Sequence, residues 1–377
     1  MPARTIDVGA LLHALDGGAP WVLLDVRNDA EVAAWQVEAR RPVDRLHVPY
    51  FAFLDEPATI FPRLPRDREI AVVCAKGGAS AMVADVLCDA GFRACTVDGG
   101  MAAYGDHLEP VRLAIAPPLA IWQLLRRGKG CLSYVVAAGG EALIVDPSRH
   151  VERYEALARE HGLRIVHVVD THVHADHVSG ARSLAARSGA VYRVDAGPGV
   201  VLGHPATTPR DGECLRLGDV EVRALAAPGH TPGSWAYLVD ERYLLSGDTL
   251  FVRGVGRPDL GGQTEAWARD LFRTLHARLA SLSDDTVILP AHFAGAEEIG
   301  DDGTVGVRLG ALRGTPAFRL DSEGAFVAAI SAAVTPAPAA YAEIVRTNLG
   351  VAGTSDEERI AEWELGPNHC AARPRTT

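Results

Sequence analysis

Six residues directly after a buried strand constrain this chain most. They read His172-Val173-His174-Ala175-Asp176-His177 and follow the apolar run at 165–169. Three imidazoles and a carboxylate on a loop at a strand end can converge on one or two metal ions. A histidine packed in the core is the ordinary alternative for any one of them, but four such groups are rarely packed together without a shared purpose. The run therefore predicts a metal centre at the end of this strand.

Three later segments supply the groups that such a centre still needs. His230 lies in a Gly/Pro-rich turn, where the backbone can approach a bound group closely. Asp248 and His292 each follow a strand-like apolar run. A lone aspartate after a strand is usually a turn former, so each segment is a weak signal by itself.

Taken in order, the histidine-rich run, the distant histidine, the Gly-Asp pair and the final histidine resemble the motif of the metallo-β-lactamase superfamily. The resemblance covers about residues 121–292. It implies an αββα sandwich with the metal site at one edge of the two sheets. It leaves the reaction open, because this superfamily includes hydrolases, nucleases and oxygen-using enzymes.

The first third of the chain has a different pattern. Apolar runs at 21–25, 70–74 and 94–97, with a helical stretch at 80–90, indicate βαβ units and a mostly parallel sheet. The whole chain has 377 residues, more than twice the length of a typical domain of about 150 residues. We therefore expect two domains.

Prolines at 109–118 disfavour regular structure and indicate the domain boundary. The predicted fold class is α/β. A parallel-sheet domain is expected at 1–110, followed by the αββα sandwich at 116–377. Within the second domain, the metal motifs occupy 172–292 and a C-terminal extension occupies 301–377.

Beyond the boundary, antiparallel pairs are expected. Apolar runs at 132–138 and 142–145 flank a Gly-Gly pair, which is typical of a β-hairpin. A helix is predicted at 151–161, and two more near the end of the chain, at 340–348 and 356–363. This layered α/β arrangement differs in kind from the first domain.

Two chemistries compete for the metal ligands. A dinuclear hydrolase would use all seven groups, with Asp248 bridging two metals and a metal-bound hydroxide attacking a thioester or lactam. A mononuclear non-haem iron dioxygenase needs only two histidines and one carboxylate, with open positions for substrate and O2. The identity of the ligands alone does not separate these chemistries.

The loop after Asp248 favours the second chemistry. Arg253 and Arg257 lie on a glycine-rich segment where they can bind a substrate carboxylate, although ordinary solvated arginines are the alternative. The pattern G-D-x-L-x-x-R-G-x-G-R-x-D is similar to that of the persulfide dioxygenases. Pro258 stands where that family tends to have threonine, and the extension passes the family's usual end, so the substrate can be a different low-molecular-weight persulfide.

This resemblance implies one Fe(II) per chain, held by His172, His230 and Asp248. It implies oxidation of glutathione persulfide, or a similar persulfide, by O2 to sulfite and free thiol. Zinc is the alternative metal. The remaining groups would form a second shell or a second metal site: His174, Asp176, His177 and His292.

A cysteine motif in the first domain suggests sulfur chemistry. Cys74 follows a buried strand and precedes a helix, so the helix dipole and exposed amides favour its thiolate. Lys76 adds a full positive charge. The pair Gly77 and Gly78 lets backbone N–H groups surround an anion.

With the segments D-V-R at 25–27 and D-G-G-M at 98–101, this motif resembles the rhodanese domain over about 6–108. The resemblance implies that Cys74 carries a persulfide received from thiosulfate or another sulfur donor. Rhodaneses commonly have arginines where this chain has Ala75 and Ala79, so an inactive rhodanese fold used for docking is the alternative.

The combined prediction is a sulfide-oxidising enzyme, a persulfide dioxygenase coupled to sulfur transfer at Cys74. The first alternative is a dizinc thioester hydrolase similar to glyoxalase II. The second is a persulfide carrier or sensor without catalysis.

Composition limits the kinds of binding partner and the cellular compartment that we expect. The formal charge is −11, from 37 basic and 48 acidic residues, and the basic residues form no cluster that would bind nucleic acid. Six dispersed cysteines without a C-x-x-C motif favour a reducing cytoplasm. No stretch approaches the roughly 20 apolar residues of a membrane span, and a homodimer is compatible with the sequence.

Overall fold

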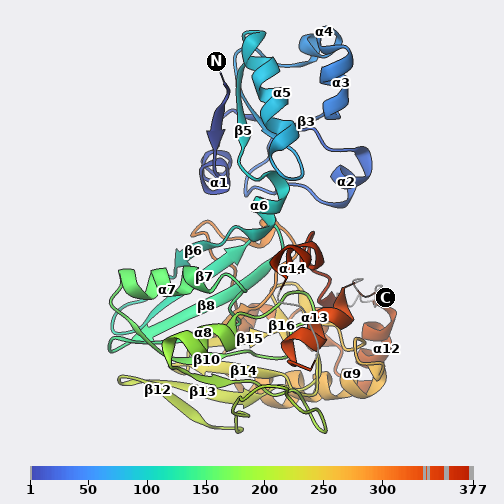
Figure 1. Cartoon of the computed structure of the whole chain (residues 1–377). Helices are drawn as coiled ribbons and strands as arrows, with labels where there is room; N and C mark the ends of the chain where they lie inside the picture. Colours follow the sequence, from blue (N-terminus) through green and yellow to red (C-terminus); the bar gives the residue numbers. More distant parts are fainter. Residues whose placement is uncertain (1, 334–336, 338–339, 352–355, 373–377) are drawn as a thin grey trace.

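A computed structural model describes residues 2–333, 337, 340–351 and 356–372 of the chain. Figure 1 shows an N-terminal domain stacked on a larger domain, with helix α14 (Glu357–Trp363) beside the junction. The rest of the expected C-terminal extension lies outside the described residues.

The N-terminal domain is built on one parallel sheet, as predicted. Its strand order is β1-β5-β4-β2-β3, and every neighbouring pair is parallel. The strands are β1 (Arg4–Ile6), β2 (Val22–Asp25), β3 (Asp44–His47), β4 (Glu69–Val73) and β5 (Arg93–Val97). The helices are α1 (Val8–Asp16), α2 (Asp29–Ala34), α3 (Tyr50–Asp55), α4 (Pro57–Ile60), α5 (Gly78–Asp89) and α6 (Gly100–Asp106).

Side chains of this sheet alternate between two small cores. Leu24 and Val72 pack with α5 on one face, whereas Leu23 and Val73 pack with α1 and α6 on the other. A parallel sheet covered on both faces needs continuous apolar runs, and the sequence supplies them.

The second domain is the predicted αββα sandwich. The first sheet contains β6 (Glu109–Arg112), β7 (Ala120–Arg126), β8 (Cys131–Ala138), β9 (Glu141–Val145), β10 (Arg164–Val169) and β11 (Val191–Arg193). The second contains β12 (Cys214–Leu217), β13 (Val220–Ala226), β14 (Trp235–Val239), β15 (Tyr243–Gly247), β18 (Val287–Pro290) and β19 (Val307–Arg308). The helices α7 (Val151–Glu160) and α8 (Ala181–Ser188) cover the first sheet, and α9 (Thr264–Arg273) and α12 (Glu323–Ala332) cover the second (Figure 1).

Strand β14 shows how the sequence specifies the layers. Trp235, Tyr237 and Val239 point into the core between the sheets, whereas Ala236 and Leu238 point toward the outer helices. The side-chain period of two residues places alternate positions on opposite faces. Burial of each large apolar side chain contributes about 1.5–3 kcal/mol.

The boundary segment at 109–118 begins with regular structure, contrary to expectation. Strand β6 pairs with β7 and forms the edge of the first sheet. Pro110 fits there because an edge strand tolerates a residue that has no N–H to donate. The second sheet system therefore begins at Glu109.

The described part of the C-terminal extension folds back over the sandwich. It contains α10 (Leu309–Leu312), α11 (Pro316–Arg319), α12, α13 (Tyr341–Asn348), α14 (Glu357–Trp363) and β20 (Ala371–Ala372). Strand β20 adds to a small sheet with β16 (Leu250–Phe251) and β17 (Gly254–Gly256). Among the described helices, none is long and apolar enough to cross a membrane.

Candidate functional site

The predicted metal-binding residues lie on loops that follow strands of both sheets. The histidine-rich run follows β10, Asp248 follows β15, and His292 follows β18. Strands β15 and β18 are parallel neighbours, so their carboxyl ends meet at one edge of the sheet. His230 reaches the same place from the loop between β13 and β14.

His172, His230 and Asp248 form one compact set of donors. Oδ2 of Asp248 lies 3.8 Å from Nε2 of His172 and 3.5 Å from Nε2 of His230. All three residues are at most 2% exposed. Nε2 of His172 and Oδ2 of Asp248 are buried and have no hydrogen-bond partner among the described residues. Because buried polar atoms are normally paired, these unpaired atoms fit a shared cation.

The opposite sides of the two rings are fixed by hydrogen bonds. Nδ1 of His230 donates to the carbonyl oxygen of Arg257 at 2.8 Å. Nδ1 of His172 lies 3.0 Å from Oγ1 of Thr171. Such partners orient the rings and leave Nε2 directed toward the metal position.

Electrostatics favour the protonation states that metal binding requires. Burial, followed by the charge of His174, lowers the pKa of His172 well below its usual value, and burial also lowers the pKa of His230. Burial raises the pKa of Asp248, but the nearby histidines, His292 first among them, outweigh this effect and hold it below its usual range. Neutral imidazoles and an ionised carboxylate are the metal-binding forms.

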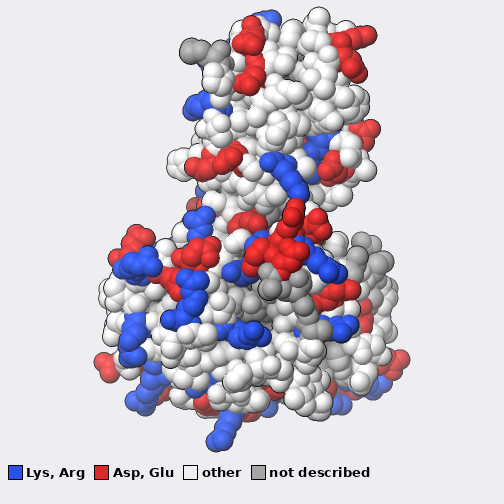
Figure 2. All heavy atoms as spheres, in the orientation of Figure 1, with Lys and Arg blue, Asp and Glu red and all other residues white. Residues whose placement is uncertain are grey.

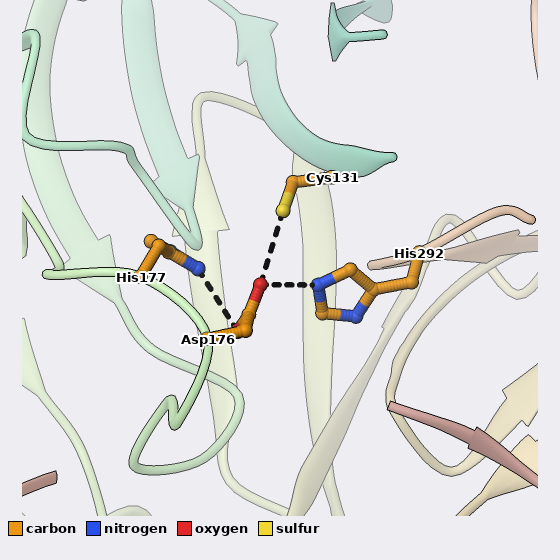
Figure 3. A group of neighbouring side chains, drawn as sticks. All are labelled: Cys131, Asp176, His177 and His292. Atoms are coloured by element: carbon orange, nitrogen blue, oxygen red, sulfur yellow. Dashed lines mark hydrogen bonds and ion pairs between the residues drawn. The ribbon is translucent and has the colours of Figure 1, made fainter. Parts of the chain in front are cut away.

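A second set of groups is centred on Asp176, as Figure 3 shows. Its Oδ2 accepts from Sγ of Cys131 at 3.1 Å and from Nε2 of His292 at 3.0 Å, and its Oδ1 lies 3.2 Å from Nδ1 of His177. Nδ1 of His292 also lies 2.6 Å from Oδ1 of Asp248. These donors therefore pair with one another, whereas the first set leaves atoms unpaired.

His292 links the two sets electrostatically. Burial lowers its pKa, but Asp248 and Asp176 raise it more, so the pKa lies well above the usual value. Burial raises the pKa of Asp176, and the charges of His292 and His177 bring it well below the usual value. An imidazolium that donates from both nitrogens satisfies both carboxylates.

His174 lies behind the first set. Its ring centroid is 4.3 Å from that of His172, and its Nε2 lies 3.1 Å from Oδ1 of Asp146. Nδ1 of His174 is buried without a partner among the described residues. The predicted metal residues are thus all gathered at one edge of the sandwich, divided between an open set and a paired set.

Two cysteines of this centre were not predicted from the sequence. Cys131, at the start of β8, contacts Asp176. Cys370, from the C-terminal extension, lies within 4.8 Å of donor atoms of Asp248 and His292, and burial raises its pKa well above the usual value. Neither cysteine belongs to a motif that places it near the metal residues.

The C-terminal extension also holds the histidine-rich loop in place. Nδ2 of Asn348 donates to the carbonyl oxygens of His174 and His177, each at 2.9 Å. Oε1 of Glu364 accepts from the amide of Val178 at 2.8 Å. These contacts join residues about 170 or more positions apart, so no local sequence pattern announces them.

The two predicted substrate-binding arginines have different surroundings. Arg257 is 1% exposed, pairs with Asp259 at 2.5 Å and donates to the carbonyl oxygen of His369 at 3.2 Å. Arg253 has a side chain that is 53% exposed, with Glu297 at 3.8 Å. Arg257 therefore anchors the extension, and Arg253 is the arginine more available to a ligand.

Cys74 lies where the predicted anion cradle requires it. Its Sγ accepts from the amide of Gly77 at 3.1 Å and lies 3.2 Å from Oγ of Ser80. Gly77 has a φ of 93°, a conformation that glycine adopts readily, and Gly78 begins α5. The backbone part of the cradle is thus present.

The side chain of Lys76 contacts the C-terminal extension. Its Nζ lies 3.9 Å from Oε1 of Glu358 on α14, and both side chains are largely exposed. Acidic side chains gather over α14 in Figure 2. The exposed members there are Asp356, Glu357, Glu358 and Glu362.

Comparisons with known proteins agree with this architecture. Residues 126–292 match the metallo-beta-lactamase superfamily, and residues 8–107 match the rhodanese-like domain. A metallo-beta-lactamase structure from Staphylococcus aureus is 30% identical, with a TM-score of 0.57, over 61% of this chain and 72% of that chain. The chain belongs to the metallo-beta-lactamase superfamily.

Other relatives of this chain are named for two different activities. Human mitochondrial persulfide dioxygenase ETHE1 is 33% identical over 40% of this chain, and a hydroxyacylglutathione hydrolase from Xanthomonas euvesicatoria is 39% identical over 42%. The chain spans 59% and 58% of the lengths of these two relatives. The structure of ETHE1 from Myxococcus xanthus is 26% identical, with a TM-score of 0.53, over 61% of this chain and 98% of that chain.

Proposed function

We propose that the chain is a persulfide dioxygenase that oxidises a low-molecular-weight persulfide, such as glutathione persulfide, with O2. A single ferrous iron would be held by His172, His230 and Asp248. The observation that carries this proposal is the unpaired state of Nε2 of His172 and Oδ2 of Asp248, which face each other in a fully buried site. Two histidines and one carboxylate are the ligand set of many non-haem iron oxygenases.

The overall reaction balances without a further reductant. A persulfide RSSH, O2 and water give the thiol RSH, sulfite and two protons. The outer sulfur loses the four electrons that O2 accepts, and the sulfur–sulfur bond is broken. When bound, ferrous iron supplies the redox chemistry that couples the two substrates, which zinc does not.

The residues of the chain prepare this site in defined ways. The buried, neutral rings of His172 and His230 present Nε2, and Asp248 presents an ionised oxygen. His292 holds protons between Asp176 and Asp248 and so fixes the direction of the Asp248 carboxylate. The burial of all three residues limits the access of water to the donors.

Cys74 is proposed to exchange sulfane sulfur with a donor such as thiosulfate. The Gly77 amide, which contacts its Sγ, supports an anionic sulfur at this position. All six cysteines are free, which suits a reducing compartment such as the cytoplasm.

A dizinc thioester hydrolase is the second candidate. The hydrolase relatives and the complete set of seven ligand residues favour it. The attached rhodanese-like domain counts against it, because a thioester hydrolase needs no sulfur-carrying cysteine such as Cys74.

Turnover with and without O2 separates the two candidates. We expect O2 uptake and sulfite formation with glutathione persulfide, and no hydrolysis of S-lactoylglutathione. Hydrolysis of that thioester under anaerobic conditions, without O2 uptake on the persulfide, would replace this proposal by the hydrolase.

A further inference from the structure

A cleft of about 1250 Å³ lies where the two domains and the C-terminal extension meet. Trp35 and Arg45 of the rhodanese-like domain line one side, and Lys129, Arg253 and His292 of the metal domain line the other. His292 is one hydrogen bond from the metal residue Asp248. The cleft therefore connects both domains with the edge of the metal centre.

Lys129 lines this cleft and differs from the neighbouring cations in its lack of an ion-pair partner among the described residues. The residue is only 4% exposed, and no carboxylate of the described residues lies within ion-pair distance of its ammonium. The neighbouring buried cations differ, because Arg126 pairs with Glu364 at 2.6 Å and Arg127 pairs with Asp16 at 2.7 Å. The ammonium nitrogen is not among the fully buried unpaired atoms of the described residues, so it reaches the cleft, where an unpaired cation favours an anionic ligand.

The C-terminal extension holds the backbone of Lys129 in place through hydrogen bonds. The carbonyl oxygen of Lys129 accepts from the backbone amide and from Nδ2 of Asn368, each at 2.9 Å. His369, which also lines the cleft, has its pKa lowered by burial and then by the charge of Lys129. The positive charge of Lys129 therefore affects His369, another residue that lines the cleft.

The other charged residues that line the cleft are compatible with binding of an anion. Glu38 uses its carboxylate to accept from the amide of Ala296 at 2.9 Å. Arg253 and Arg45 also line the cleft, and both are exposed cations. Glu298 also lines the cleft and has an interaction of its own.

We infer that Lys129 binds a carboxylate of the thiol that carries the persulfide, and that the rhodanese-like domain forms part of this binding site. The nature of the outer sulfur rests on the proposed function. Binding of the thiol skeleton does not depend on the proposed function, and the two can be tested separately.

The chain offers a direct test because its two lysines are Lys76 and Lys129. Reductive methylation of the full chain, followed by peptide mass spectrometry, reports on each lysine. With saturating S-methylglutathione, we expect methylation of Lys129 to slow at least several-fold and that of Lys76 to stay unchanged. Equal rates with and without this probe would overturn the inference, as would protection of Lys129 by thiosulfate alone.

Variants supply a second test. Lys129→Gln should raise the Kd for S-methylglutathione about tenfold, as expected for loss of a charged hydrogen bond, and should raise KM more than it lowers kcat. Lys129→Arg should recover most of the affinity. Arg216→Gln, on an arginine whose side chain is 74% exposed and which does not line the cleft, is the matched control.

The outcomes distinguish this inference from the proposed function. Unchanged Kd in Lys129→Gln, with normal O2 uptake, would overturn the role of Lys129 and leave the dioxygenase intact. Lysine-dependent binding of S-methylglutathione without O2 uptake on the persulfide would preserve the binding site and overturn the proposed oxidation.

Discussion

Asp248 has a carboxylate oxygen that faces both Nε2 atoms of the proposed iron ligands. Its other oxygen is held by His292 at 2.6 Å. Replacement by alanine removes a ligand and also leaves His292 without one of its two anions.

We expect Asp248→Ala to lower iron affinity by more than about 100-fold, the upper range for loss of an outer-shell partner, and to abolish O2 uptake. Iron content and O2 uptake measure the effect. Asp219→Ala, at an exposed position away from the site, is the control. Iron binding and O2 uptake at wild-type levels in Asp248→Ala would remove this carboxylate from the ligand set.

Cys74 belongs to a separate chemical step. Cys74→Ser should abolish sulfur transfer from thiosulfate to cyanide and leave O2 uptake on added glutathione persulfide unchanged, because the metal residues lie in the other domain. Cys214→Ser, at an exposed cysteine, should change neither activity. Sulfur transfer that survives in Cys74→Ser would exclude Cys74 as the sulfur carrier, whereas no transfer by the wild-type chain would favour the inactive rhodanese fold.

The sequence indicated the residues of the metal centre, and the resemblance to persulfide dioxygenases implied their division into three ligands and a second group of four. The histidine-rich run was recognisable because its members are adjacent and follow a strand. Cys370 was not, because its place beside Asp248 depends on the pairing of β20 with β17. Arg257 lies on the predicted loop, but its burial against Asp259 and the extension required the tertiary structure.

At the scale of elements, strands were predicted best. The hairpin β8–β9, strand β10 and the parallel sheet of the first domain follow from apolar runs and glycine turns, and the structure confirms them. Strand β6 was missed because prolines were interpreted as breaks, although an edge strand accepts them. The packing of α13 and α14 against the histidine-rich loop was not predicted, because it depends on contacts between residues far apart in the sequence.

Helix α13 offers a test of that packing through Asn348. Asn348→Ala removes both hydrogen bonds to the carbonyl oxygens of His174 and His177. We expect metal affinity to fall about 10-fold or more, because the loop that presents His172 is held less firmly. Competition with a chelator measures this affinity, and Glu343→Ala on the exposed side of the same helix is the control. An unchanged affinity would show that the extension does not support the loop.

At the scale of the whole molecule, a buried ion network joins three parts of the chain. Arg126 contacts Asp106 of the rhodanese-like domain at 2.7 Å and Glu364 of the extension at 2.6 Å. Arg149 contacts the same two carboxylates. If the chain has the two proposed activities, linking the domains in this way would raise the local concentration of a shared intermediate.

We expect Glu364→Gln to lower the free energy of unfolding by about 3 kcal/mol, the low end for a broken buried ion pair, because Arg126 keeps Asp106. Burial raises the pKa of Glu364, but Arg126 and His177 hold it below the usual value. The contribution is therefore present at neutral pH and is lost as the pH falls through that lowered pKa. Urea unfolding at pH 7 measures the change, with exposed Glu362→Gln as control. Equal stability of both variants would contradict a structural role for the network.

The most direct test of a mononuclear iron site is the metal content of the 377-residue chain purified from iron-supplied cells. We expect about one iron per chain, because His172, His230 and Asp248 form one compact set of three donors with unpaired atoms. About two zinc ions per chain, retained after purification and exchange into metal-free buffer, would contradict it.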